Sequence, residues 1–341
     1  MIRSAVLAVA LLTCACSTPG RPNAATPSRV ATPPRVVIDE QAWMAIAPNG
    51  RILATPHWRL YTTAPPLGVI DRSLPALLES ALATYTTRHA DLPRPNRAME
   101  MFVLASRPQW ARLTRRLAPE DAPQLLRIDR GGYTVNARSV LFDIGPRDTL
   151  ALATHEGWHL YTQSVFADPL PLWLEEGVAV SMEGMRTDPD TGRPRLNAWA
   201  NVERFDQLRV AEATGSLLSL SQVLDSSPAG LLHARGSADT ALTWYAQTWA
   251  LVHFLREHAD GRHRAALATL LQDAAEGRLS QRLGNRALAV RNGRAVFAAY
   301  FDDDLVRADQ AYRAFIRELV RTGAKDRIVA GRSPIRERSL Q

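Results

Sequence analysis

The stretch that decides the fold runs from Thr149 to His159 and reads Thr-Leu-Ala-Leu-Ala-Thr-His-Glu-Gly-Trp-His. Neither glycine nor proline interrupts it before Gly157, and Asp148 is a suitable N-cap, so we expect a helix. On a helix, His155 and His159 lie one turn apart on one face, where both imidazoles can reach the same metal ion. Gly157 costs about 1 kcal/mol relative to alanine inside a helix. Close packing against a neighbouring element would explain it.

Glu156 lies beside the expected ion without having to bind it. A carboxylate in that place can take a proton from a metal-bound water, whose pKa zinc lowers to about 7. This is the chemistry of peptide-bond hydrolysis, and it makes Glu156 the candidate catalytic base. We expect Zn²⁺ from the ligand types, and the same donors also suit other divalent ions.

A third ligand has to come from elsewhere in the chain, because catalytic zinc sites use three protein ligands and keep a fourth position open for water or substrate. The segment Leu170–Ala179 reads Leu-Pro-Leu-Trp-Leu-Glu-Glu-Gly-Val-Ala and follows the first motif closely. Glu176, separated from His159 by sixteen residues, is the candidate.

Together the two motifs resemble those of the gluzincin peptidases, in which HExxH is followed by a second helix whose Glu-Gly pair carries the third ligand. Residues Trp173–Ala179 look like the Trp-Leu-x-Glu-Gly-x-Ala helix of the aminopeptidase-type clan. By that match Glu176, and not Glu175, is the ligand. The nearer resemblance is to a DUF1570-type family of bacterial proteins, and it spans roughly residues 58–255. It implies a zincin-like fold and metallopeptidase chemistry without naming a substrate.

Similar enzymes place a tyrosine that donates to the oxyanion of the tetrahedral intermediate, and Tyr245 falls at the matching point in chain order. A well-placed donor contributes roughly 3 to 4 kcal/mol to lowering the barrier. Tyr245, Trp249 and Val252 also fit a buried helix stripe, so a structural role stays open. His233 and His253 are alternative donors.

Glu183 is seven residues after Glu176 and therefore two turns along the same helix face. From there its carboxylate could orient a histidine ligand through a hydrogen bond. A solvated glutamate near the helix end is the alternative interpretation.

The amino terminus has the features of an export signal: Arg3 is followed by an apolar run over residues 5–12, too short to span a bilayer. The run ends at Cys14 and Cys16, which resembles a bacterial lipoprotein signal with Cys16 as the acylation site. Cys14, ordinary cleavage near Ala15 and a disulfide are the alternatives. No aspartate follows Cys16, and by bacterial sorting rules this suggests an outer-membrane lipoprotein facing the periplasm.

Composition divides the rest of the chain. Residues 17–37, rich in Pro, Thr and Ala, read as an extended tether. We expect an N-terminal α+β half over 38–145, a helical half over 146–325 and a basic tail over 326–341. The segment 325–341 contributes +3 to the net charge of +7, which would suit anionic lipid or cell-wall polymer, although arginine is abundant throughout the chain. No nucleic-acid motif accompanies the charge.

The expected fold class is α+β, zincin-like, with a small mixed sheet first and mainly helices afterwards. Strands are predicted at 58–63 and 100–105, with an extended stretch from 131 to 143, and helices at 202–213, 240–258, 264–275 and 304–322. In similar peptidases a sheet edge pairs with an extended substrate. Tyr133–Asn136 and Val140–Phe142 are the two candidates for that edge.

These patterns favour a zinc-dependent peptidase, held in the bacterial envelope by an N-terminal lipid anchor and acting on a peptide or protein. The alternative is a metal-stabilised lipoprotein that acts as a binding or assembly factor. The intact glutamate of the motif favours the enzyme, because a purely structural zinc site fills all four positions and has no use for a free base.

Overall fold

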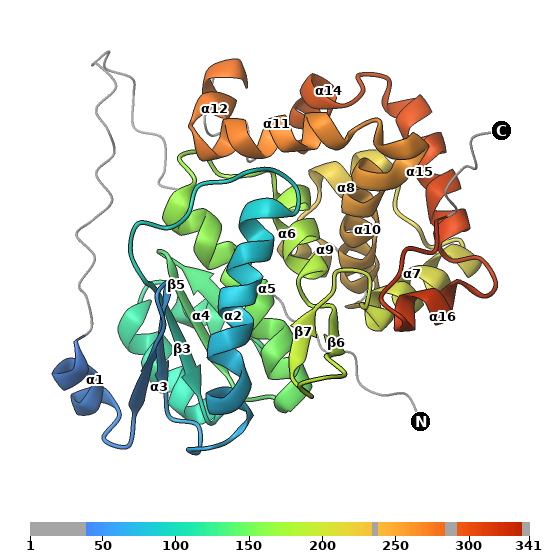
Figure 1. Cartoon of the computed structure of the whole chain (residues 1–341). Coiled ribbons are helices and arrows are strands. Elements are labelled where there is room, and N and C mark those ends of the chain that lie inside the picture. Colours follow the sequence, from blue (N-terminus) through green and yellow to red (C-terminus); the bar gives the residue numbers. More distant parts are fainter. Residues whose placement is uncertain (1–38, 234–237, 284–291, 336–341) are drawn as a thin grey trace, which may run out of the picture.

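The chain has an α+β fold, in which a five-stranded sheet forms the N-terminal half and helices form most of the C-terminal half (Figure 1). The computed structural model describes residues 39–233, 238–283 and 292–335. The α+β arrangement confirms the predicted fold class. The signal segment, the tether and Cys16 lie outside the described residues. Among those residues, no helix is both long and apolar enough to span a bilayer.

The sheet has the strand order β1-β2-β3-β5-β4. Strands β2 and β3, and β3 and β5, pair in parallel, whereas the outer pairs β1–β2 and β4–β5 are antiparallel. A two-residue turn with positive φ at Asn136 and Ala137 joins β4 to β5, as a tight hairpin requires. Because β4 is last in the strand order, it forms one edge of this sheet. The strands are β1 (Arg51–Ala54), β2 (Trp58–Thr62), β3 (Met99–Leu104), β4 (Gly132–Val135) and β5 (Arg138–Phe142).

Side chains of the central strands alternate between two cores, one on each face of the sheet, as the two-residue period of a strand dictates. Tyr61 and Phe102 stack at 4.5 Å in the core beneath α1 (Glu40–Ile46), α3 (Arg107–Leu117) and α4 (Ala122–Leu125). Their neighbours Leu60 and Met101 point into the other core, which α2 (Val69–Thr87) and α5 (Pro146–Val165) cover. This second core continues into the helical half, so one apolar interior joins the two halves.

Helix α5 carries the HExxH motif and begins at Pro146, with Gly145 at the N-cap, so Asp148 lies in the first turn and the expected N-cap was wrong. Proline is favoured at the first helical position because its missing N–H would have no helical partner there. The side chain of Asp143 accepts from the Gly145 N–H at 2.9 Å and from the Thr149 hydroxyl at 3.0 Å, which fixes the entry into the helix.

Gly157 is in close contact with α2 and β2, as its place inside a helix suggested. A β-carbon at this position would lie 2.7 Å from the Tyr85 hydroxyl oxygen and 3.3 Å from the Trp58 ring. The same hydroxyl donates to the carbonyl of Thr154 one turn earlier on α5. The glycine therefore lets α5 lie close to α2.

Gly157→Ala is expected to destabilise the fold by about 1–3 kcal/mol, because the overpacking penalty exceeds the gain in helix propensity. Urea denaturation would measure the free energy of unfolding. Tyr85→Phe removes the obstructing oxygen, so the alanine should cost less in that background. An equal cost in both backgrounds would contradict this explanation.

The second half is built around α10, which packs against α6, the helix that bears the second motif. The predicted helices at 202–213 and 264–275 have the expected bounds, whereas the short β6–β7 hairpin after α6 was not predicted. The elements are α6 (Leu172–Ser181), β6 (Met185–Thr187), β7 (Pro194–Leu196), α7 (Val202–Ala213), α8 (Leu220–Asp225), α9 (Pro228–His233), α10 (Ala238–Glu257), the 3-10 turn η1 (His258–Gly261), α11 (Arg264–Ala275), α12 (Arg278–Leu283), α14 (Gly293–Tyr300), α15 (Leu305–Leu319) and α16 (Ala324–Val329).

Gly177 sets the distance between α6 and α10. A β-carbon there would lie 2.6 Å from the carbonyl oxygen of Thr248 and 2.8 Å from the Val252 side chain, both on α10. Only a residue without a side chain allows the two helices to approach this closely.

The segment that composition assigned to a basic tail begins inside α16, and the structure describes it as far as residue 335. Ile328 of this helix is fully buried, and Lys325 pairs with Asp206 of α7 at 2.6 Å. Ser333 donates to Glu257 at the end of α10. This part of the segment is thus folded against the helical half, because Ile328 and its neighbours complete the apolar core there.

Candidate metal centre

His155 and His159 of α5 and Glu176 of α6 bring three potential ligand atoms together in the interior. Their atoms all lie within 4.8 Å of one another, and each residue is at most 1% exposed. The two Nε2 atoms are 3.1 Å apart, and they lie 3.5 and 3.7 Å from Glu176 Oε2. Two ligands at 2.0–2.1 Å from a tetrahedral ion are about 3.4 Å apart. The group can therefore hold a metal ion.

A carboxylate faces the far nitrogen of each histidine. Glu183 Oε1 is 3.0 Å from Nδ1 of His155, and Glu175 Oε1 is 2.8 Å from Nδ1 of His159. An imidazole that donates through Nδ1 can present the lone pair of Nε2 to an ion, so these contacts orient both rings for metal binding. Glu183 faces His155 as the sequence suggested, but α6 ends at Ser181, so Glu183 lies beyond the helix and the predicted place on its face was wrong.

Glu175 is one of the site residues that sequence reasoning missed. The resemblance excluded it as a ligand and gave it no other role. In the structure Glu175 Oε1 accepts from the Thr162 hydroxyl at 2.8 Å as well as facing His159. The signal was present in the sequence as a carboxylate beside the ligand position, but only the packing of α6 on α5 shows which histidine it meets.

Charge at the centre favours a bound cation. Burial lowers the pKa of His155, but the neighbouring carboxylates of Glu176 and Glu183 outweigh it and raise the pKa to about 10. Burial would raise the pKa of Glu183, yet Arg204 and His155 lower it to about 2. Both oxygens of Glu176 are buried without a hydrogen-bond partner among the described residues. These are the surroundings that a positive ion would satisfy.

Glu156 is held by the sheet. Its Oε2 accepts from the Thr134 hydroxyl at 2.7 Å, and Thr134 in turn lies 2.7 Å from the Ser139 hydroxyl on the facing strand. The other oxygen, Oε1, is buried and has no partner in the part of the chain that the structure describes. One carboxylate oxygen is thus held by a hydrogen bond, and the other makes none to the described residues. The sequence did not point to Thr134 or Ser139.

Tyr245 extends from α10 and is buried, with a hydroxyl that finds no partner among the described residues. Burial and the charge of Glu176 raise its pKa well above the ordinary value, so the hydroxyl keeps its proton. The Arg204 guanidinium lies 5.4 Å from the centre of the tyrosine ring and also pairs with Glu183. The phenol therefore belongs to the same electrostatic cluster as the candidate metal ligands.

The two histidines considered as alternatives to Tyr245 have different outcomes. His253 stacks on Trp199 with ring centres 3.6 Å apart, and burial followed by the charges of Arg88 and Arg256 lowers its pKa well below the ordinary value. It is a core histidine beside an arginine pair. His233 ends α9, and its side chain lies outside the described residues.

Of the two candidate segments, only β4 is an edge strand of the sheet, because β5, which contains Val140–Phe142, lies between β3 and β4. The main chain of β4 is partly engaged already. Gln163 of α5 donates to the carbonyl of Thr134 at 3.2 Å and accepts from the N–H of Ala137 at 3.0 Å. An added strand would meet this glutamine.

No protein-family model matches the chain, and neither the curated proteins nor the solved structures contain a match.

Removing the charge of an orienting carboxylate should weaken metal binding. Glu183→Gln is expected to lower zinc affinity by about 10- to 100-fold, because Nδ1 of His155 loses its charged acceptor. Competition against a coloured chelator would measure the affinity. Glu79→Gln is the matched control, since Glu79 lies 2.8 Å from His57 Nδ1 in the sheet half. An equal loss in the control, or none in Glu183→Gln, would remove Glu183 from the site.

Proposed function

We propose that this protein is a zinc-dependent peptidase of the gluzincin type, which hydrolyses peptide bonds with a metal-activated water. One observation carries the proposal: three ligand atoms converge at tetrahedral spacing while Oε1 of Glu156, next to His155 on the same helix, is buried without a partner among the described residues. Zinc would be held by His155, His159 and Glu176, and when bound it would lower the pKa of water and polarise the peptide carbonyl.

The residues around the centre have complementary tasks in this proposal. Glu156 takes the proton from the water through Oε1, while the Thr134 hydroxyl on Oε2 prevents the carboxylate from rotating. Tyr245 keeps its proton and donates to the developing oxyanion. Glu175 and Glu183 keep the imidazoles oriented throughout.

An extended peptide or protein segment is the proposed substrate. Strand β4 is the sheet edge next to α5, so its free main-chain groups could pair with such a segment. Because Gln163 already bonds Thr134 and Ala137, the pairing would begin on the Gly132 side of Thr134 or would displace the glutamine.

The proposed location rests on the first 37 residues of the sequence. With residues 1–16 as a lipoprotein signal, acylation of Cys16 and the tether that follows would hold the enzyme at the outer membrane, facing the periplasm. Its substrates would then be envelope peptides or proteins.

The burial of the centre supports a second candidate, a metal-stabilised envelope lipoprotein that binds or assembles other components. All three ligand residues and Glu156 are at most 1% exposed, as a purely structural site would be. For such a protein Glu156→Gln would have no effect on function, whereas His159→Ala would unfold the chain.

Metal removal tests the proposal. The full chain is incubated with a mixed peptide library before and after treatment with a zinc chelator, and the products are read by mass spectrometry. We expect cleavage to stop with the chelator and to return with about one equivalent of zinc per chain. A chain that retains zinc and cleaves nothing in the library would instead support the binding protein.

A further inference from the structure

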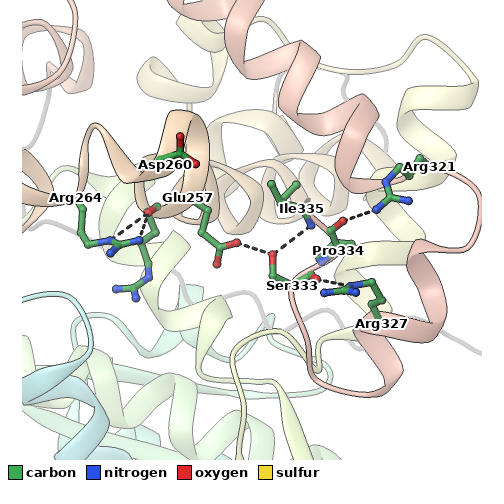
Figure 2. Close-up of a pocket in the computed structure, with 9 residues that line it drawn as sticks. Glu257, Asp260, Arg264, Arg321, Arg327, Ser333, Pro334 and Ile335 are labelled. Carbon is green, nitrogen blue, oxygen red and sulfur yellow. Dashed lines mark hydrogen bonds between the residues drawn. The ribbon is translucent and has the colours of Figure 1, made fainter. Parts of the chain in front are cut away.

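A cavity lies in the helical half, where the end of α10, the η1 turn and the start of α11 face residues 321–335. Its volume is about 760 Å³, within the range of small-molecule sites. Figure 2 shows Arg264 on one side, Arg321 and Arg327 on the other, and Glu257 and Ser333 between them. With Arg256, the lining holds four arginines against two carboxylates, a formal charge of +2.

These arginine charges are not matched by carboxylates at the cavity. In the described part of the chain their hydrogen bonds go mainly to neutral main-chain carbonyls: Arg264 donates to Arg256 at 3.1 Å and Arg321 to Pro334 at 2.7 Å, while Arg327 donates to Ser333. The Nε atoms of Arg256 and Arg321 are buried and have no partner among the described residues. The cavity is therefore lined by arginine cations whose hydrogen bonds go mainly to neutral groups.

The charge of Glu257 offsets part of the charge of Arg256, but its hydrogen bonds are made to neutral groups. Glu257 accepts from the indole N–H of Trp199 at 3.1 Å and from the hydroxyl of Ser333, which are both neutral donors. Burial followed by the charge of Arg264 lowers the pKa of Arg256, as expected where cations outnumber anions.

The backbone beside the cavity is strained. Ala259, Asp260 and Gly261 have φ of 48°, 58° and 84°, and residues other than glycine rarely adopt such values. This turn reverses the chain after α10 and brings Arg264 back against the Arg256 carbonyl. Strain of this kind is found mostly where a site requires it.

We propose that this cavity is an anion site that takes a ligand with phosphate groups. Arginine matches phosphate oxygens with paired N–H donors, and arginines on two sides of one cavity suit a diphosphate or two neighbouring phosphates. The phosphates can belong to a free small molecule or to a lipid headgroup. The site is separate from the metal centre and does not depend on the function proposed for it.

Calorimetric titration of the full chain with inorganic pyrophosphate tests the site. Binding should weaken at least about tenfold for Arg264→Gln or Arg327→Gln, and further for the double variant, because each change removes a charged donor. Arg116→Gln on α3, an exposed arginine of the sheet half, removes the same charge elsewhere and should leave the affinity within about twofold. Thermal melts establish that each variant is folded. Should the double variant melt early, either single variant decides the question.

A second arm separates the two sources of phosphate. The same variants are sedimented with phosphatidylglycerol vesicles, and with phosphatidylcholine vesicles as the neutral control. Pyrophosphate binding that depends on Arg264 and Arg327 indicates a free ligand, and vesicle binding with the same dependence indicates a headgroup. No binding in either arm overturns the proposal. Heat of binding that persists in the double variant would come from pyrophosphate at the metal centre, and it would also overturn the proposal. A loss of affinity that Arg116→Gln reproduces would overturn it as well.

Discussion

Replacing Glu156 with glutamine is expected to lower peptide hydrolysis by about 10²- to 10⁴-fold while zinc stays bound. Glutamine has the size of glutamate and can still accept from Thr134 on its amide oxygen, but it cannot take a proton from water. The proposed zinc ligands His155, His159 and Glu176 are unchanged in this variant, so the metal content should remain at about one ion per chain.

The measurement pairs kcat/KM on a cleaved peptide with elemental analysis of the same sample. Glu79→Gln makes the same chemical change in the sheet half and should keep full turnover. Undiminished hydrolysis by the Glu156 variant would show that another group activates the water. Loss of zinc together with turnover would show that the carboxylate acts as a ligand.

His159→Ala is expected to abolish tight metal binding, because it removes one of three ligands. It also leaves Glu175 and Glu176 buried without the imidazole that both face at present. Removing one partner of a buried charged pair costs about 3–5 kcal/mol, so the variant should be markedly less stable as well as metal-free.

Elemental analysis after dialysis and urea denaturation test the two effects separately. His57→Ala removes a histidine that also lies 2.8 Å from a carboxylate but is not part of the group formed by His155, His159 and Glu176, and it should keep the zinc. Stability of the wild-type chain should fall when zinc is removed by a chelator, since a ligand that binds only the folded state stabilises it. Stoichiometric zinc in His159→Ala would refute the ligand set.

Spacing within one helix is the part of the site that the sequence predicts best. His155, Glu156 and His159 are placed by the helical period alone, and α6 needed only the second motif to be located. The fold class followed similarly, because β-branched and aromatic runs precede the motif and helical periods follow it. Both inferences depend on residues that are close in the chain.

Contacts across elements could not be predicted in this way. Thr134 and Ser139 reach Glu156 only because the β4–β5 hairpin has one register and lies against α5. A shift of one residue would turn both hydroxyls to the other face of the sheet. Glu175 meets His159 through the packing of two helices, and α16 folds inward because Ile328 finds a core that the local sequence does not contain.

The close approach of α6 and α10 at Gly177 has a consequence for how such a protein can vary. Glu176 precedes this glycine on one helix, and Tyr245 precedes the contacted Thr248 on the other, so the same contact sets the separation of the proposed metal ligand and the phenol. Even one added methyl group at position 177 would push the two helices apart, although all of the reactive side chains would still be present. Position 177 would then tolerate substitution as poorly as the proposed ligand positions, although glycine has no reactive side chain.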